Sequence, residues 1–355
     1  MVNYLLICVS LLAVNAFVPA PTTFRSISSS NSPSTQLWDG KSNIIRDRIK
    51  TVKNTKKITM AMKLVAAAKV RKAQDAVMQT RPFSETLQSV FGGLIARLGN
   101  EAADLPLLQQ REIKKVTMVI ISGDRGLCGG YNSYVIKKAE KRYNDLLSKG
   151  LEVNMIIVGK KANVYMTRRG YPIIKYYDCG QNPNAAEATA ISEELLELYL
   201  SGETDSVELT YTRFISLIAS ETSARTLLPL SATGIESEGD EIFQLTSSSG
   251  DIKVEKSETG AAAPKEFPAD MIFEQDPVQI LNAILPLYLN GQILRTLQES
   301  VASELAARMQ SMQAASDNAG ELADELSMQY NRARQAAVTA ELLEIVSGAA
   351  AIEQG

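Results

Sequence analysis

The chain has 355 residues, a formal net charge of −3 and no histidine. The absence of histidine excludes a Ser-His-Asp triad, a Cys-His pair and any imidazole metal ligand. If Cys8 is removed with the leader described next, Cys128 and Cys179 remain, and two thiols are too few for a zinc site made of cysteines alone. Apolar residues (45%) suffice for a folded core, and the wealth of alanine, leucine, glutamate and lysine is typical of long helices.

The first 37 residues have the composition of a two-part targeting leader. Residues 5–14 (LLICVSLLAV) form an apolar run too short to span a membrane, and the small residues Val14 and Ala16 predict cleavage after Ala16. Residues 17–37 are rich in serine, threonine and proline and contain no acid, as transit peptides do. We expect a signal peptide at 1–16 and a transit peptide at 17–37. The alternative, a secretory signal followed by a disordered linker, is disfavoured because a secreted protein of this size usually has more cysteine pairs.

Long helices are predicted at both ends of the remaining chain. Residues 41–81 contain neither proline nor glycine, carry a net charge of +10, and repeat apolar residues at helical spacing. Pro82 is expected to kink or restart this helix, which we place at 38–100. Asp276 and Pro277 are typical of a helix start, and residues 292–347 contain only Gly320 as a weak point. We place this second helix at 276–355.

The second helix carries a heptad pattern that predicts a coiled-coil seam. One row consists of Leu305, Met312, Ala319, Leu326, Ala333 and Ala340. The companion row contains Val301, Ala315, Leu322, Ala336 and Leu343. Because residues 277–353 carry a net charge of −5, they suit the basic first helix, and we expect an antiparallel coiled coil of the two ends. The basic stretch is also compatible with nucleic acid or an anionic membrane. It lacks interleaved aromatic residues, however, so no nucleic-acid partner is expected.

Between the helices, strand and helix patterns alternate. Apolar strand patterns at 116–121, 153–158, 173–176 and 207–218 are separated by helical patterns at 132–148, 160–169 and 185–200. This alternation predicts a Rossmann-like α/β domain with a largely parallel sheet over residues 110–270. Residues 236–265 are polar and rich in serine, glycine and acid, which indicates a hairpin and a connection into the last helix.

A glycine-rich segment, residues 122–132 (SGDRGLCGGYN), follows the first strand at the place where phosphate loops occur. Its glycines do not form G-x-G-x-x-G, and residues 122–132 contain no G-K-[ST]. We favour glycines that permit a tight strand-to-helix turn. Two alternatives remain: a stand-alone α/β nucleotide-binding module with a coiled-coil tail, and a helical scaffold that only binds partners.

Four segments resemble the signatures of one family, the gamma subunits of rotary proton-translocating ATP synthases. They are residues 58–69 (ITMAMKLVAAAK), 124–130 (DRGLCGG), 303–318 (SELAARMQSMQAASDN) and 330–350 (YNRARQAAVTAELLEIVSGAA). The resemblance extends from about residue 44 to residue 352. It implies a coiled coil that turns inside a ring of alpha and beta subunits, and an α/β domain beside the epsilon subunit and the membrane c-ring. It also implies no bond chemistry and no cofactor or metal, because the rotation driven by proton flow acts by mechanical coupling.

The resemblance further implies residue roles and a location. The residues expected to contact the ring are Met62, Lys63, Lys69, Arg308, Arg334, Gln335, Thr339 and Glu341. The central motif supplies a turn formed by Asp124, Arg125, Gly126, Cys128, Gly129 and Gly130. The leader resembles the bipartite leaders of plastids acquired by secondary endosymbiosis, so we expect a peripheral protein on the stromal face of the thylakoid membrane.

One departure from the family bears on regulation. Green-plant plastid members carry an extra segment with two closely spaced cysteines after a Leu-Leu-Pro-Leu strand end. Here the same four residues, 227–230, are followed by SATGIESEGDEIFQL, without cysteine. We therefore expect the dithiol switch of those members to be absent.

Overall fold

The structure, a computed structural model, describes residues 35–98, 111–229, 241–248, 251–258 and 277–353. The predicted signal peptide and most of the predicted transit peptide therefore lie outside the described residues. The chain divides into two compact units. The central unit comprises residues 50–324, and the terminal unit comprises residues 1–49 and 325–355.

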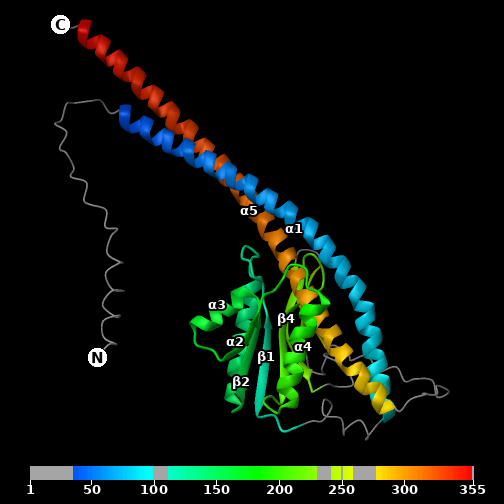
Figure 1. Cartoon of the computed structure of the whole chain (residues 1–355). Helices are drawn as coiled ribbons and strands as arrows, with labels where there is room; N and C mark the ends of the chain where they lie inside the picture. Colours follow the sequence, from blue (N-terminus) through cyan, green and yellow to red (C-terminus); the bar gives the residue numbers. More distant parts are fainter. Residues whose placement is uncertain (1–34, 99–110, 230–240, 249–250, 259–276, 354–355) are drawn as a thin grey trace, which may run out of the picture. The chain divides into compact units, whose positions relative to one another are not determined.

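Two long helices and an α/β domain make up the described chain (Figure 1). Helix α1 spans Thr35–Leu98 and helix α5 spans Pro277–Glu353. Helix α1 starts three residues earlier than predicted and runs through Pro82 as one element, so of the two outcomes expected at Pro82, a kink or a restart, the restart does not occur. Helix α5 likewise contains Pro286.

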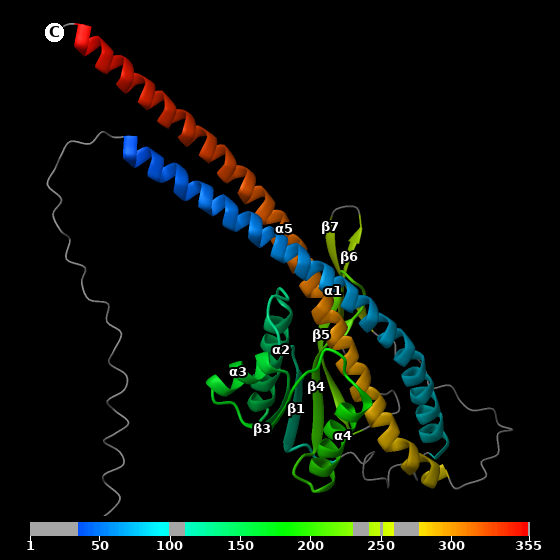
Figure 2. The same ribbon diagram turned by 45° about the horizontal axis from the view of Figure 1, so that its top comes forward.

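The α/β domain follows the predicted order closely. Its helices are α2 (Tyr131–Ser148), α3 (Lys160–Arg168) and α4 (Ala185–Leu200). Its strands are β1 (Lys115–Ile121), β2 (Glu152–Val158), β3 (Ile173–Tyr177), β4 (Ser206–Phe214) and β5 (Ser220–Leu228). Strands β6 (Glu241–Ser248) and β7 (Asp251–Glu258) form the separate antiparallel hairpin seen in Figure 2, as predicted.

The five strands form one sheet in the order β3-β2-β1-β4-β5. Strands β1 to β4 are parallel, and β5 returns antiparallel along β4 at the sheet edge. The pattern predicted as strand at 207–218 thus contains all of β4 except Ser206, followed by the turn into β5. Order 3-2-1-4 is that of a doubly wound sheet, in which β1 and β4 flank the point where the connections change direction.

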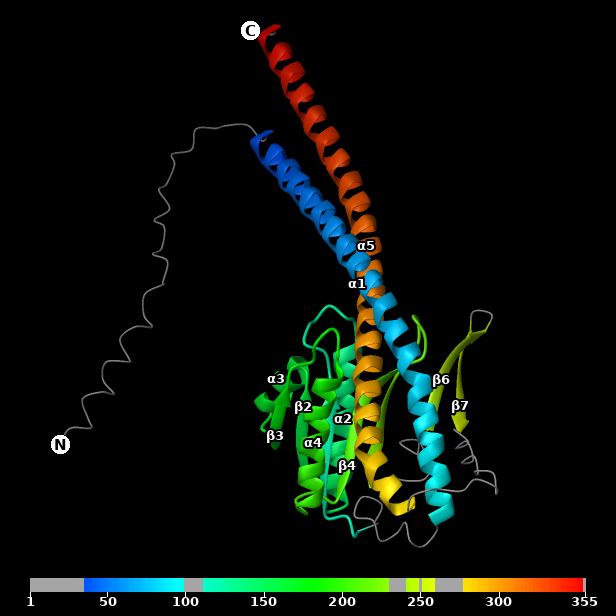
Figure 3. The same ribbon diagram turned by 45° about the vertical axis from the view of Figure 1, so that its right-hand side comes forward.

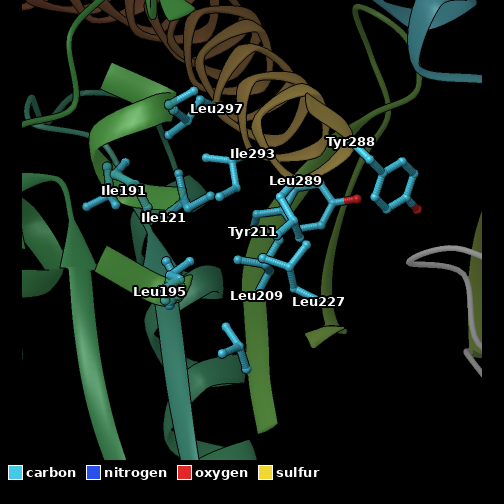
Figure 4. Close-up of a cluster of buried hydrophobic side chains, with 14 of the residues drawn as sticks. Ile121, Ile191, Leu195, Leu209, Tyr211, Leu227, Tyr288, Leu289, Ile293 and Leu297 are labelled. Atoms are coloured by element: carbon cyan, nitrogen blue, oxygen red, sulfur yellow. The ribbon is translucent and has the colours of Figure 1, made fainter. Parts of the chain in front are cut away.

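Each face of the sheet is covered by helices. Alternate β1 residues, Val116, Met118 and Ile120, pack with α2 and α3 on one face. On the other face, Val119 and Ile121 belong to a second cluster that also contains residues of α4, α5 and α1. Figure 4 shows how α4 and α5 contribute to this cluster, where Ile191, Leu195, Leu289, Ile293 and Leu297 gather near the strands. Helix α5 is therefore part of the domain core.

Helices α1 and α5 run antiparallel within the central unit (Figure 3). The rings of Phe91 and Tyr288 stack with centroids 4.8 Å apart. Further along, Lys56 of α1 approaches Gly320 of α5. Because higher numbers on α1 meet lower numbers on α5, the predicted antiparallel pairing is confirmed for this unit.

The two predicted seam rows have different outcomes. In the first row, Leu305, Met312, Ala319 and Leu326 are all buried. The last two members of this row, Ala333 and Ala340, are half-buried. In the companion row only Val301 is buried. Leu322 is 46% exposed and Leu343 64% exposed, so the prediction that this row lies in the seam is wrong beyond its first members. A two-helix contact covers a narrow stripe, and this stripe contains the first row together with Ser316 and Ala323, which lie four residues after Met312 and Ala319.

Leu326 provides a test of this seam. Leu326→Asp places a carboxylate at a 7% exposed position and should cost about 2–4 kcal/mol of coiled-coil stability, through lost apolar contacts and an unpaired charge. Amide hydrogen exchange of residues 319–333 should become clearly faster. Leu322→Asp is the matched control and should leave exchange close to wild type. Equal protection in both variants would place Leu326 outside the seam.

Candidate functional site

The glycine-rich segment forms the turn between β1 and α2, and its polar groups hold it to the neighbouring strand ends. The backbone N–H of Gly123 donates to Asn132 Oδ1 at 3.0 Å. Asp124 Oδ1 accepts the backbone N–H groups of Lys160 at 2.9 Å and Cys179 at 3.3 Å. Asp124 thus ties the turn to the ends of β2 and β3, and the motif is a packed structural turn.

Three glycines, spaced three residues apart in this turn, contact one side of α5: Gly123 and Gly129 through their Cα atoms and Gly126 through its carbonyl. A Cβ at Gly123 would lie 2.6 Å from the carboxyl carbon of Glu304. The Gly126 carbonyl accepts from Arg308 Nε at 3.3 Å. A Cβ at Gly129 would lie 2.6 Å from Ser311 Oγ.

Helix positions 304, 308 and 311 fall on one face because they are four and three residues apart. Arg308 also donates to the Glu304 carboxylate, so the two side chains meet the turn as an ion pair. We call this set of contacts the glycine joint: Gly123, Gly126 and Gly129 of the turn with Glu304, Arg308 and Ser311 of α5.

The glycine joint occupies the crevice where doubly wound sheets bind ligands. That crevice lies at the carboxyl ends of the strands flanking the change in direction, here β1 and β4. Gly123 follows the end of β1, and Ser303 Oγ of α5 donates to the Thr212 carbonyl near the end of β4 at 3.4 Å. Helix α5 therefore fills the crevice from within the same chain. This arrangement argues against nucleotide binding at the turn.

Three of the four predicted ring-contact residues of the central unit, Met62, Lys69 and Arg308, line one cavity. The cavity holds about 500 Å³ and is lined by α1, the glycine turn and α5. Met62, 41% exposed, lies in its apolar wall with Leu127, and Lys69, Arg125 and Arg308 add positive charge. Lys69 donates to Gln181 Oε1. Lys63 is half-buried and does not line the cavity.

Leu127 is held in an unusual backbone conformation at the edge of this cavity. Its φ of 62° lies in the left-handed region, which non-glycine residues seldom adopt. Its side chain is 64% exposed. The turn therefore presents an apolar side chain outward, while Gly123 and Gly129 face α5.

The remaining predicted contact residues lie in the terminal unit and are all exposed. They are Arg334, Gln335, Thr339 and Glu341. Thr339 Oγ1 donates to the Gln335 carbonyl at 2.9 Å, a bond internal to the helix. The structure therefore places the predicted contact residues on two separate surfaces, one in each unit.

Both described cysteines are buried free thiols. Burial raises the pKa of Cys128 and that of Cys179, and the charge of Glu304 adds to each increase. A raised pKa lowers the fraction of reactive thiolate at neutral pH. Neither thiol therefore has the environment of a reactive cysteine.

The described ranges contain no group of three or more Cys, Asp or Glu side chains arranged to hold a metal ion. None of their helices has a stretch long and apolar enough to cross a membrane.

The partners of the glycine turn on α5 could not be found from local sequence patterns. No local pattern marks Glu304 or Ser311 as a contact residue. For Arg308, the family resemblance implies a contact with the ring rather than with the turn. One indication of a close contact is present in the sequence, namely that Gly123, Gly126 and Gly129 recur every three residues, but it does not indicate the partner. The contact joins residues about 180 positions apart, a separation that local periodicity does not report.

Asp124 allows the structural role of the turn to be measured. Asp124→Ala removes the acceptor of two backbone N–H groups and should lower the free energy of unfolding by about 1–3 kcal/mol in urea. Asp124→Asn retains a side-chain oxygen and should lose less than half of that. Asp145→Ala, at an exposed position of α2, is the control. Equal stability of the Asp124→Ala and control variants would contradict the role given to Asp124.

Comparison with known proteins agrees with these features. A family model described as ATP synthase matches residues 41–352. The chain is 71% identical to the chloroplastic ATP synthase gamma chain of Trieres chinensis over 323 residues, 91% of this chain and 87% of the relative. It is 69% identical to the chloroplastic gamma chain of Phaeodactylum tricornutum, over 90% of this chain and 86% of the relative. The gamma chain of the cyanobacterium Synechococcus elongatus is 57% identical over 87% of this chain and 98% of the relative.

Solved structures show the same fold at low sequence identity. A chain of the Euglena gracilis mitochondrial ATP synthase aligns with a TM-score of 0.58 and 18% identity, covering 89% of this chain and 96% of that one. A second Euglena gracilis structure, of the rotor, aligns with a TM-score of 0.54. The family match and the identities of the relatives extend over nearly all of the described residues. The chain therefore belongs to the ATP synthase gamma chain family, the central-stalk subunits of the rotary ATP synthases.

Proposed function

We propose that this chain turns as the central shaft of a plastid ATP synthase and couples proton flow across the thylakoid membrane to ATP synthesis in a surrounding ring. The proposed partners are the alpha and beta subunits around the coiled coil, and the epsilon subunit and membrane c-ring at the α/β domain. The chloroplastic relatives and the leader composition support the plastid location on the stromal face of the thylakoid membrane. The chain would be attached to the membrane only through the complex.

The observation that carries this proposal is the surface of α5 in the terminal unit. Apolar side chains remain 50% to 82% exposed near its end, and they are Val338, Leu342, Leu343, Ile345, Val346 and Ile352. Exposed apolar surface of this extent is characteristic of a protein contact. Arg334 and Gln335 precede this stretch on the same helix. A surrounding ring of subunits would cover the apolar end and contact these polar residues.

The cavity of the central unit supports a second contact with the ring. Its wall contains the apolar side chains of Ile58, Met62 and Val65, and its cationic residues suit an acidic loop of a catalytic subunit. Lys69 and Arg125 are the exposed cations of this rim. Lys63 belongs to the proposed contact through its place on the same helix.

We further propose that the chain performs no catalysis of its own. The sequence has no histidine and no G-x-x-x-x-G-K-[ST] phosphate loop, since the G-K-S at residues 40–42 has no glycine five residues before Gly40. The crevice that could hold a nucleotide contains Glu304 and Arg308 of α5 instead. Its contribution to ATP synthesis would be the position it imposes on the catalytic subunits as it turns.

The ring contact in the terminal unit is tested by Arg334→Ala with Gln335→Ala in the assembled complex. Both residues are exposed, so the isolated variant should keep its helix content and melting temperature. ATP synthesis should fall several-fold because polar contacts with the ring are lost. Asn331→Ala with Arg332→Ala, two exposed positions nearby, is the matched control. Wild-type synthesis in the first double variant would remove these residues from the contact.

The absence of a dithiol switch predicts that reductant leaves the complex unaffected. ATP hydrolysis by the purified complex should be the same, within about 20%, with and without dithiothreitol, because both described thiols are buried and their pKa values are raised. The variant with Cys128→Ser and Cys179→Ser is measured alongside. Several-fold activation by dithiothreitol that disappears in the serine variant would contradict the prediction.

A further inference from the structure

We propose that Glu304 is a positioning residue that locks the α/β domain to the shaft, by taking the place of an anionic ligand at the glycine turn. The proposal goes beyond the shaft function, because it identifies where the domain that meets the membrane sector is fastened to the helix that turns. It rests on the shaft function for one of its two tests only.

The first support is the steric match between turn and helix. A Cβ at position 123 would lie 2.6 Å from Glu304 Cδ and Oε2, so any residue larger than glycine there requires the Glu304 carboxyl group to move away from the turn. Gly129 has a φ of +57° and is equally close to Ser311 Oγ, 2.6 Å from its Cβ position. These two contacts lie on one face of α5, about two helical turns apart, and together they resist both sliding of α5 along the turn and its rotation against it.

The second support is the charge of the contact. Glu304 is 7% exposed, and a buried carboxylate is costly unless it is paired. Arg308 pairs with it, and Arg308 Nη2 also donates to the Gly126 carbonyl at 3.2 Å. Burial raises the pKa of Glu304, while the hydrogen bond from Arg308 acts in the opposite direction. The ion pair thus joins helix and turn through both of its members.

The third support is the position of the contact in the sheet. The turn after β1 is where a doubly wound sheet presents backbone groups to a phosphate or another anion. Here the anion belongs to the same chain and lies on the helix that continues into the coiled coil. Because the turn is also held by Asp124 and Asn132, force on α5 reaches the strand ends directly. The other contacts of α5 in the domain core are mostly between apolar side chains. Such contacts are not directional, whereas the ion pair at the turn fixes α5 at one position along the turn.

The coupling test uses four variants in the complete ATP synthase reconstituted in liposomes. Glu304→Gln keeps the shape and removes the charge, Glu304→Ala removes the carboxyl group, and Gly123→Ala introduces the clash. The double variant with Gly123→Ala and Glu304→Ala replaces the carboxyl group by a methyl group of the turn. Glu321→Gln, at an exposed position of the same helix, is the control.

Protons pumped per ATP hydrolysed should fall at least about two-fold in Glu304→Gln, Glu304→Ala and Gly123→Ala, with hydrolysis itself retained. The double variant should assemble better than Gly123→Ala because the clash is relieved, but it should remain uncoupled because the carboxylate is absent. A wild-type pumping ratio in Glu304→Gln and Glu304→Ala would overturn the proposal.

The second test measures amide hydrogen exchange in the full-length chain alone, so it does not depend on assembly. In Glu304→Gln, residues 123–130 should exchange faster, while β2 and the second half of α2 stay protected. Unchanged exchange in the turn would overturn the proposal even if the complex fails to assemble. If the wild-type chain joins no ATP synthase while the turn loosens as expected, the shaft function fails and the joint stands.

Discussion

The close approach of α5 to the glycine turn is the contact on which the arrangement of the central unit depends. Side chains at positions 123 and 129 would displace the Glu304 carboxyl group and the Ser311 hydroxyl group, so glycines at both positions allow these groups to lie against the turn at the ends of β1 and β4. Once there, α5 occupies the one place where a sheet of this order would otherwise bind a ligand. In this chain, the crevice that binds small molecules in other doubly wound sheets holds a helix instead.

Helix α5 also provides part of the domain core and is one of the two helices of the coiled coil. From Leu281 to Ala306 its apolar residues pack with α4, the sheet and α1 in a single cluster. From Met312 to Leu326 its buried residues follow two heptad rows, one of Met312, Ala319 and Leu326 and one of Ser316 and Ala323. The described domain is therefore built around the shaft, and removing α5 would open the core as well as the crevice. This continuity suits a part that must transmit torque between its two ends.

Local patterns were sufficient for elements whose signals lie within a few residues. Helix α4 has its predicted bounds because Asn184 and Glu187 form a capping box that starts it. Patterns failed where the deciding partner is distant. The run after Phe214 lacks glycine or proline, so the turn into β5 left no signal, and Leu322 has seam spacing but lies off the narrow contact stripe. Glu304 belongs to the candidate site only because it contacts a turn far away in the sequence. Within residues 277–353 nothing distinguishes it from the other eight acidic residues.

The most direct test of this account is an electron cryomicroscopy structure of the assembled complex in several rotational states. When α5 residues 300–312 are superposed, the α/β domain should coincide in every state, and the Glu304 carboxyl group should remain against Gly123 with Arg308 on the Gly126 carbonyl. Any twisting of the shaft should then occur outside this segment. A domain that changes its position on α5 between states, with Glu304 leaving the turn, would contradict the claim that the glycine joint fixes the domain to the shaft.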